Sequence, residues 1–149
     1  MSVAGVQEYT TEVAATPAEC FDAIMDFEAY PKWSSAVKYA RVVERDQKGY
    51  GRIVEFRIDL PLKTIRYVLE YTHKKPSELR WRSVDGDIES IEGHYSFKKS
   101  GPKGARVTCQ QSIRIGFWLP GPLRNLLERT ALRDSVEEFK AEVERRKRA

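Results

Sequence analysis

The stretch Val54-Glu-Phe-Arg-Ile-Asp-Leu60 alternates an apolar with a charged side chain at every step. A strict period of two is the signature of a β-strand with one buried and one solvated face. Residues 65–71, Ile-Arg-Tyr-Val-Leu-Glu-Tyr, keep an apolar or aromatic side chain at every second position. Because Leu60-Pro61-Leu62 supplies a turn between the two stretches, the sequence predicts an antiparallel hairpin here.

Strand patterns continue on both sides of this hairpin. Residues 78–84 follow a turn at Pro76-Ser77, Asp85-Gly86 is a strong signal for a hairpin turn, and residues 100–104 separate two further strands. The predicted strands cover residues 7–15, 37–46, 53–60, 64–71, 78–84, 88–99 and 106–115. Their short connections indicate an antiparallel meander of about seven strands.

Helix signals lie near the two ends of the chain. Thr16-Pro17-Ala18-Glu19 has the form of a capping box, with proline at a position where its missing N–H costs nothing. A helix is therefore predicted from Pro17 to Asp26, and Pro31 opens a second short helix through Trp33. One long helix is predicted from Pro122 to Arg148. Its apolar stripe consists of Leu123, Leu126, Leu127, Val136, Phe139 and Val143.

The composition indicates one globular domain over residues 1–149. With 41% hydrophobic and 32% charged residues, it excludes a disordered chain, a fibrous protein and a disulfide scaffold. The 26 Lys and Arg are interleaved with 22 Asp and Glu along most of the chain, which is typical of a solvated surface. The basic run near the C-terminus is short and has no aromatic platform beside it, so no nucleic-acid partner is expected.

The sequence also bears on location. No stretch approaches the roughly 20 apolar residues of a membrane-spanning helix, and residues 1–10 carry no apolar block typical of a signal peptide. The two cysteines, Cys20 and Cys109, lie far apart without a CxxC pattern. We therefore expect a cytoplasmic protein. The sequence names no partner surface and gives no oligomeric state.

This order of elements predicts an α+β layout in which a curved antiparallel sheet faces a long terminal helix. A twisted sheet of this size curls, and one helix does not fill its concave side, so a cavity is expected. Its walls would be the apolar phase of the strands, with a roof from the terminal helix. These residues are Phe56, Ile58, Tyr67, Leu69, Tyr71, Trp81, Tyr95 and Ile113, roofed by Leu123, Leu126 and Leu127, with Ser83, Cys109 and Gln111 as polar groups.

Three stretches of the chain resemble a known family. They are Thr16-Pro17-Ala18-Glu19-Cys20-Phe21, Asp26-Phe27-Glu28-Ala29-Tyr30-Pro31-Lys32-Trp33 and Gly93-His94-Tyr95-Ser96-Phe97. Together with the order of elements, they resemble the polyketide cyclase/dehydrase and lipid-transport branch of the START-like (SRPBCC) superfamily. The resemblance implies a helix-grip fold, in which a curved seven-stranded antiparallel sheet surrounds a long C-terminal helix, with two short helices after the first strand. The superfamily also includes coenzyme Q-binding proteins, so the fold alone does not give the function.

Most of the candidate ligand contacts are the alternate strand residues on the face of the sheet that is expected to lie towards the helix. They are Phe56, Ile58, Tyr67, Leu69, Tyr71, Trp81, Tyr95, Gln111, Leu123 and Leu127. The alternative is that these side chains fill a solid core, although so many hydroxyl-bearing aromatics favour a partly polar cavity. Tyr30 and Trp33 either form a lip of the cavity or pack the two short helices together.

Two functions are preferred at this stage, and a third, a protein-interaction module, stays open because some proteins with this fold serve as adaptors. The first is binding or transport of a hydrophobic small molecule, such as a lipid, an isoprenoid quinone or a polyketide-like aromatic. The alternative is a cyclase, aromatase or dehydratase, with Tyr67, Tyr95 and Gln111 as the catalytic candidates that polarise a carbonyl. Alternation with Tyr95 turns His94 outward, and no acid–base set is found, so binding without catalysis is preferred.

Partners and cofactors are limited. The sequence holds two histidines without a flanking ligand cluster and no phosphate-binding loop, so no metal and no cofactor are expected. The apolar loop Gly116–Pro120 has two possible fates. It either folds under the sheet or touches a membrane transiently during ligand exchange, helped by Arg114, Arg124 and the basic C-terminal run.

Overall fold

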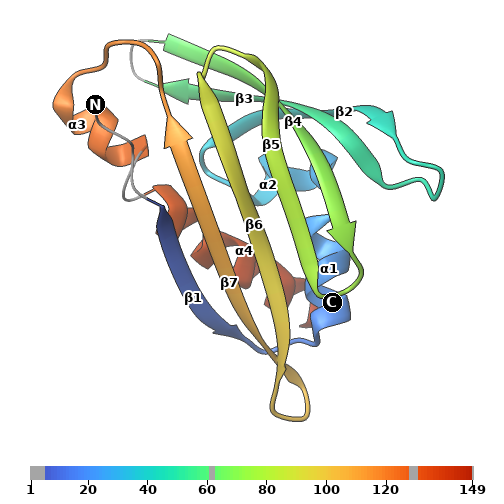
Figure 1. The fold of residues 1–149 in the computed structure, drawn as a ribbon. Helices are drawn as coiled ribbons and strands as arrows, with labels where there is room; N and C mark the ends of the chain where they lie inside the picture. Colours follow the sequence, from blue (N-terminus) through green and yellow to red (C-terminus); the bar gives the residue numbers. More distant parts are fainter. Residues whose placement is uncertain (1–5, 61–62, 128–130, 149) are drawn as a thin grey trace.

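Within residues 6–60, 63–127 and 131–148, which the computed structural model describes, seven strands form one antiparallel sheet and the helices cover one of its faces (Figure 1). In chain order the elements are β1 (Gln7–Val13), α1 (Pro17–Ile24), the 3₁₀ turn η1 (Phe27–Ala29), α2 (Tyr30–Trp33), β2 (Val37–Arg45), β3 (Gly51–Leu60), β4 (Lys63–Lys74), β5 (Glu78–Gly86), β6 (Ser90–Ser100), β7 (Gly104–Arg114), α3 (Gly121–Asn125) and α4 (Ala131–Arg148). No helix in these ranges is long and apolar enough to cross a membrane.

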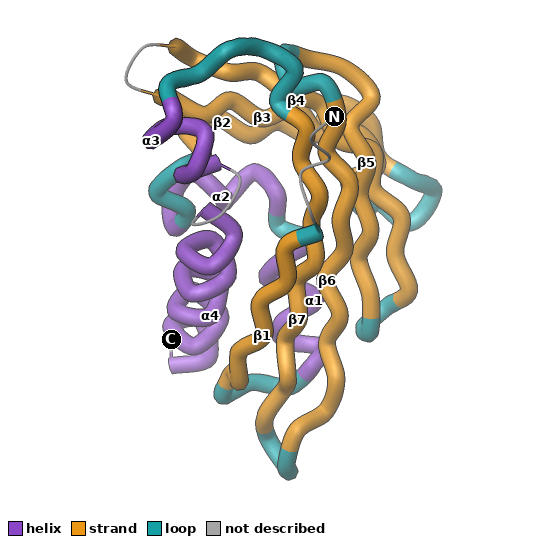
Figure 2. The backbone as a smooth tube through the Cα atoms, turned by 60° about the vertical axis from the view of Figure 1, so that its left-hand side comes forward, coloured by secondary structure: helices purple, strands orange, loops and turns teal. Residues whose placement is uncertain are grey.

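The strand order is β1-β7-β6-β5-β4-β3-β2. The strands from β2 to β7 follow one another as antiparallel neighbours, which confirms the predicted meander, and β1 completes the sheet by pairing with β7 from Gln7↔Gln111 to Val13↔Ala105. Figure 2 shows the sheet on one side and α4 on the other. The core lies between them, and its largest fully buried side chains include Phe21, Phe56 and Phe139.

The capping box of α1 is confirmed. The Glu19 amide donates to the Thr16 hydroxyl at 3.2 Å, and the Thr16 amide donates to the Glu19 carboxylate at 2.9 Å. The Lys147 ammonium lies 2.8 Å from the same carboxylate, which joins the end of α4 to the start of α1. Together Lys147 and the Thr16 amide lower the pKa of Glu19 to about 2. The basic run at the end of α4 therefore serves to anchor the helix.

The predicted turn at Asp85-Gly86 is displaced. Gly86 is the last residue of β5 and pairs with Tyr67, while the chain reverses after it. Its φ is +112°, and a Cβ at this position would lie 2.5 Å from the Arg66 carbonyl oxygen, so only glycine fits there. Asp87 then continues the contact with β4 beyond the end of β5. Its amide donates to the Arg66 oxygen at 2.7 Å, and its carboxylate accepts from the Arg66 amide at 2.8 Å.

Two further predictions, the turn at Leu60-Pro61-Leu62 and the terminal helix, include residues outside the described ranges. Pro61 and Leu62 lie outside them, and Leu60 pairs directly with Lys63. The predicted helix from Pro122 to Arg148 corresponds to α3 and α4, with residues 128–130 outside the description. Figure 1 shows α3 lying away from the line of α4.

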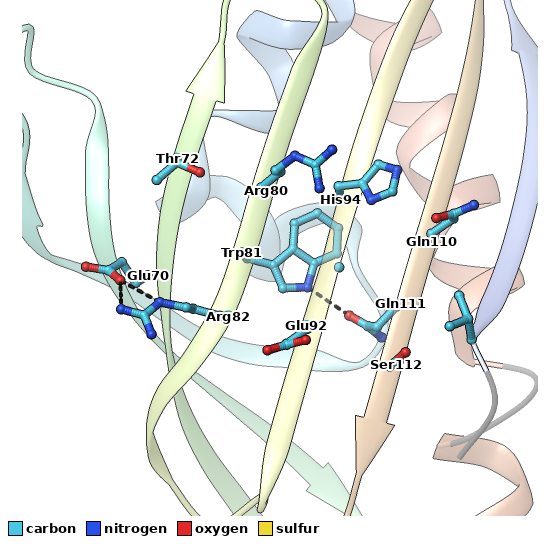
Figure 3. Close-up of a pocket in the computed structure, with 12 residues that line it drawn as sticks. Glu70, Thr72, Arg80, Trp81, Arg82, Glu92, His94, Gln110, Gln111 and Ser112 are labelled. Atoms are coloured by element: carbon cyan, nitrogen blue, oxygen red, sulfur yellow. Dashed lines mark hydrogen bonds and ion pairs between the residues drawn. The ribbon is translucent and has the colours of Figure 1, made fainter. Parts of the chain in front are cut away.

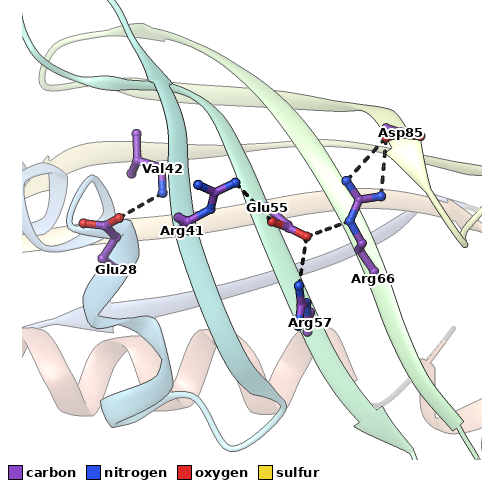
Figure 4. A network of polar contacts seen from close by, with 7 residues as sticks. All are labelled: Glu28, Arg41, Val42, Glu55, Arg57, Arg66 and Asp85. Atoms are coloured by element: carbon purple, nitrogen blue, oxygen red, sulfur yellow. Dashed lines mark hydrogen bonds and ion pairs between the residues drawn. The ribbon is translucent and has the colours of Figure 1, made fainter.

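A carboxylate is buried on the outer face of the sheet (Figure 4). Glu55 is only 6% exposed, and its oxygens lie 2.6 Å from Arg66, 3.5 Å from Arg57 and 3.8 Å from Arg41. The Arg66 hydrogen bond, above all, lowers the pKa of Glu55, so the carboxylate is ionised at neutral pH. Three arginines from three neighbouring strands thus compensate for one buried charge.

Candidate functional site

A cavity of about 170 Å³ lies between the concave face of the sheet and the helices α2 and α4. On this measure one water needs roughly 10–15 Å³, so the cavity has room for a small molecule or a group of waters. The lining comprises Ile24, Tyr30, Trp33, Ser34, Ala36, Val37, Phe56, Ile58, Tyr67, Leu69, Tyr71, Leu79, Trp81, Ile88, Ile91, Tyr95, Cys109, Gln111, Ile113, Leu127, Ala131, Leu132 and Ser135. Among these described residues there is no Asp, Glu, Lys, Arg or His.

The structure brings together most of the residues that the strand phase marked as ligand contacts. Phe56, Ile58, Tyr67, Leu69, Tyr71, Trp81, Tyr95, Gln111 and Leu127 all line the cavity. The predicted roof is wrong in part, because Leu123 and Leu126 do not line it, and Leu126 is 43% exposed. Ser83 is also absent from the lining, since its hydroxyl accepts a hydrogen bond from the Ile91 amide at 2.9 Å.

The polar pair Trp81 and Gln111 spans three strands on the inner face. Trp81 pairs with Gly93, and Gly93 pairs with Gln111. The indole N–H of Trp81 donates to the Gln111 amide oxygen at 3.1 Å. Only a glycine lets the indole cross β6, because a Cβ on Gly93 would lie 2.6 Å from the Trp81 ring. This arrangement holds a large flat surface against the cavity.

Four tyrosines place their phenol groups around the same space. Burial is the main cause that raises the pKa of Tyr30, Tyr67, Tyr71 and Tyr95. Tyr67 and Tyr71 come from one face of β4, and Tyr30 comes from α2. At neutral pH all four are protonated, so each can donate a hydrogen bond and none can act as a base.

Tyr30 and Trp33 pack the short helices, and both also line the cavity. The Tyr30 hydroxyl donates to the Ile24 carbonyl oxygen at 2.6 Å, and its ring lies 4.9 Å from the Trp33 ring. The Trp33 ring also lies 6.0 Å from Phe139 of α4. The Trp33 indole nitrogen is buried and has no hydrogen-bond partner among the described residues.

Several lining residues were not predicted from the sequence. Ala131, Leu132 and Ser135 of α4 form the roof in place of Leu123, and Ser34 and Val37 contribute beside α2. The helical spacing of Leu132, Val136 and Phe139 is a signal for the buried face of α4 that was available in the sequence. No local signal marks Ser34.

The buried thiols are inert. Burial raises the pKa of Cys20 to about 12 and also raises that of Cys109, so both remain protonated. Cys109 lines the cavity and contacts the Tyr95 hydroxyl, in keeping with a small buried side chain.

A second hollow lies on the outer face of the sheet, across β4 to β7 (Figure 3). Its volume is about 520 Å³, larger than that of the inner cavity, but it is open to solvent and lined by charged side chains such as Glu70, Arg80 and Arg82. Arg82 donates to Glu70 at 2.9 Å. His94 lies here beside Arg80 and Gln110, pointing outward as predicted. The enclosed, uncharged inner cavity is therefore the better candidate for a small-molecule site.

Solved structures of other proteins share this architecture. A START superfamily protein from Mycobacterium smegmatis has a TM-score of 0.83 at 20% identity, covering 94% of this chain and 97% of its own. The Zhui aromatase/cyclase from a Streptomyces species has a TM-score of 0.80 at 17% identity, covering 97% and 96%. A protein from Thermus thermophilus has a TM-score of 0.77 at 21% identity, covering 95% and 96%. These similarities confirm the helix-grip fold.

The family assignment rests on the sequence itself. A comparison with curated proteins finds no match. The family model described as polyketide cyclase / dehydrase and lipid transport matches residues 13–140, which spans the strands and helices that build the cavity. The chain therefore belongs to the polyketide cyclase / dehydrase and lipid-transport family.

Proposed function

We propose that the protein binds or carries a neutral hydrophobic small molecule, such as an isoprenoid quinone, a lipid or a polyketide-like aromatic, in the cavity between the sheet and α4. The observation that carries the proposal is the lining, which joins aliphatic and aromatic side chains to a few uncharged polar groups. Ligand sites in proteins have this composition. The protein would do this in the cytoplasm, where its two free thiols, Cys20 and Cys109, stay reduced.

Binding without turnover is favoured over catalysis by the state of the polar groups. A general acid or base works best when its pKa lies near the working pH. Burial moves the pKa of Tyr67 and Tyr95 further from neutrality, and Gln111 does not titrate. Tyr67 and Gln111 can donate a hydrogen bond to a carbonyl oxygen, but none of the three residues can accept its α-proton.

The alternative function is a cyclase, aromatase or dehydratase acting on a reactive polyketide-like chain. It is supported by the family and by the similarity to a structure named as an aromatase/cyclase. A substrate that reacts readily once folded needs mainly a shaped cavity and hydrogen-bond donors. Incubation of the protein with a poly-β-ketone tests this, because a cyclised product formed faster than in buffer would support the alternative.

The apolar loop after β7 suggests how a ligand could be exchanged. Leu119 is buried, with 7% of its surface exposed, whereas Trp118 is 79% exposed. Phe117 is half-buried, and the Lys63 ammonium lies 4.3 Å from the centre of its ring. We propose that Trp118 inserts into a membrane surface during exchange while the neighbouring cations face anionic headgroups.

Native mass spectrometry of the purified protein, with chromatography of a solvent extract, tests the main proposal. Two alanines of α4 allow a matched comparison. Ala131 lines the cavity and is the test position, whereas Ala141 is exposed and is the control. An apolar mass retained by the wild type and by Ala141→Trp, but lost from Ala131→Trp, supports binding in this cavity. A mass retained equally by Ala131→Trp places the ligand elsewhere. If no variant retains a mass, titration with a neutral naphthalene, followed by the fluorescence of Trp33 and Trp81, decides the question.

A further inference from the structure

We propose that the ligand carries a neutral carbonyl oxygen, and that the hydroxyls of Tyr67 and Tyr71 on β4 are the donors that the cavity offers to it. The inference rests on the proposed binding function and names the chemical class of its ligand.

The argument begins with the hydrogen bonds that are already made inside the cavity. The Tyr30 hydroxyl donates to Ile24, and the Trp81 indole donates to Gln111. The Tyr95 hydroxyl interacts with Cys109 and Ser135. These groups are satisfied by the protein itself, so a ligand gains little from them.

Tyr67 and Tyr71 differ from the others. Both line the cavity, and neither hydroxyl has a hydrogen-bond partner among the described residues. Both hydroxyls open on the cavity, unlike the Trp33 indole nitrogen, which is the buried side-chain polar atom without a partner among the described residues. Tyr67 and Tyr71 are four residues apart on β4, so they lie on the same face of the strand and present two free donors to one cavity.

Both tyrosine rings are fixed by packing, which makes the hydroxyls a preformed site. The Tyr67 ring stacks on Phe56, with centroids 5.4 Å apart. The Tyr71 ring lies 4.4 Å from Phe27 and 6.2 Å from Trp81. Little side-chain freedom remains to be lost when a ligand binds.

The protonation state of the two phenols selects the kind of ligand group. A protonated phenol donates its hydrogen to an oxygen acceptor, and the lone pairs of a carbonyl oxygen accept such a hydrogen bond. A carboxylate would also accept, but no described residue of the lining carries a positive charge. Burying an unpaired ion is costly, so a neutral ketone or quinone is favoured over a fatty acid anion.

Three naphthalenes of similar size separate these possibilities: 2-acetylnaphthalene is a neutral ketone, 2-ethylnaphthalene lacks oxygen, and 2-naphthoate is an anion. Their dissociation constants are measured by calorimetry with the wild type, Tyr67→Phe, Tyr71→Phe and Tyr39→Phe. Tyr39 is the control because it lies on β2 outside the cavity lining, with its ring under Arg57 at 4.5 Å. Each Tyr→Phe change removes one oxygen atom, and 2-ethylnaphthalene reports whether the cavity is intact.

The expected result is a loss of affinity for the ketone of roughly 3- to 10-fold in Tyr67→Phe, in Tyr71→Phe or in both, the size of one neutral hydrogen bond. Affinity for 2-ethylnaphthalene stays the same or rises, Tyr39→Phe changes neither, and 2-naphthoate binds more weakly than the ketone. If ketone and hydrocarbon respond alike to the substitutions, or if 2-naphthoate binds most tightly, the inference is overturned while the binding function stands. If none of the three naphthalenes binds, the binding function fails and the inference fails with it.

Discussion

The indole N–H of Trp81 donates a hydrogen bond to the amide oxygen of Gln111, two strands away, over the bare backbone of Gly93. Gly93 thereby sets the position of one of the two indoles that line the cavity. The same indole lies 5.7 Å from the Tyr95 ring and 6.2 Å from the Tyr71 ring. A displaced indole would therefore also change the packing of these two rings.

Gly93→Ala tests this arrangement. The new methyl group would lie 2.6 Å from the Trp81 ring and 2.5 Å from the Gln110 carbonyl oxygen, so both must move. We expect a loss of roughly 1–3 kcal/mol in the free energy of unfolding, as for other overpacked sites. Urea unfolding measures it, and Gly121→Ala is the control because a Cβ there meets nothing within 4 Å. Equal stabilities of the two variants would contradict the account.

The buried carboxylate Glu55 gives a second prediction. Glu55→Gln leaves Arg41, Arg57 and Arg66 facing one another without their shared anion. Because breaking a buried ion pair costs more than breaking an exposed one, we expect a loss of roughly 1–3 kcal/mol. The matched change Glu44→Gln removes an exposed partner of Arg52 and should cost below about 1 kcal/mol. Thermal and urea unfolding of both variants compare the two costs.

The ion pairs of Glu142 within α4 should make the stability of the protein depend on pH. Arg145 is the largest cause that lowers the pKa of this carboxylate to about 2, and Arg146 adds to it. A lowered pKa in the folded state means that the stabilisation is complete above the unfolded value of about 4.3 and is lost as the pH falls towards 2. Glu142→Gln should therefore cost roughly 1–2 kcal/mol at pH 6 and much less at pH 2.5.

Unfolding curves of the wild type and Glu142→Gln at both pH values give this difference, and Glu92→Gln, an exposed site on β6, serves as the control. A difference that grows as the pH falls would refute the assignment.

Trp118 provides a test of membrane contact that does not depend on the cavity. With 79% of its surface exposed, Trp118→Ala should leave the unfolding free energy within about 0.5 kcal/mol of the wild type. Binding to vesicles of phosphatidylcholine and phosphatidylserine, measured by co-sedimentation, should fall several-fold. Val43→Ala, which removes an exposed apolar side chain from β2, is the control. Equal vesicle binding by the wild type and Trp118→Ala would contradict the proposal that Trp118 inserts into a membrane surface.

The parts of the fold that follow from local patterns were predictable. The alternation from Val54 to Leu60 indicated the inner face of β3, and Thr16 to Glu19 indicated the start of α1. Neighbouring strands repeat the same phase, so most of the cavity lining followed once the sheet was expected to curl around a helix.

The features that could not be predicted depend on distant partners. Gly86 looked like a turn glycine, but it ends β5 because the Arg66 backbone approaches it too closely for any side chain. Periodicity identified an apolar stripe in the terminal region without indicating which turns of it would lie over the cavity. Leu123 was therefore expected in the roof, where Leu132 and Ser135 are found.

The pairing of β1 with β7 has a consequence for how the chain acquires this structure. Val13 pairs with Ala105, and Lys147 of α4 reaches Glu19 of α1, so contacts that close the molecule join residues about a hundred positions apart in sequence. Contacts of such long sequence separation are typical of slow folding. During synthesis, β1 stays unpaired until most of the chain has left the ribosome, because its partner β7 is made late. Over that interval β7 cannot shield the exposed edge of β1 from pairing with other chains.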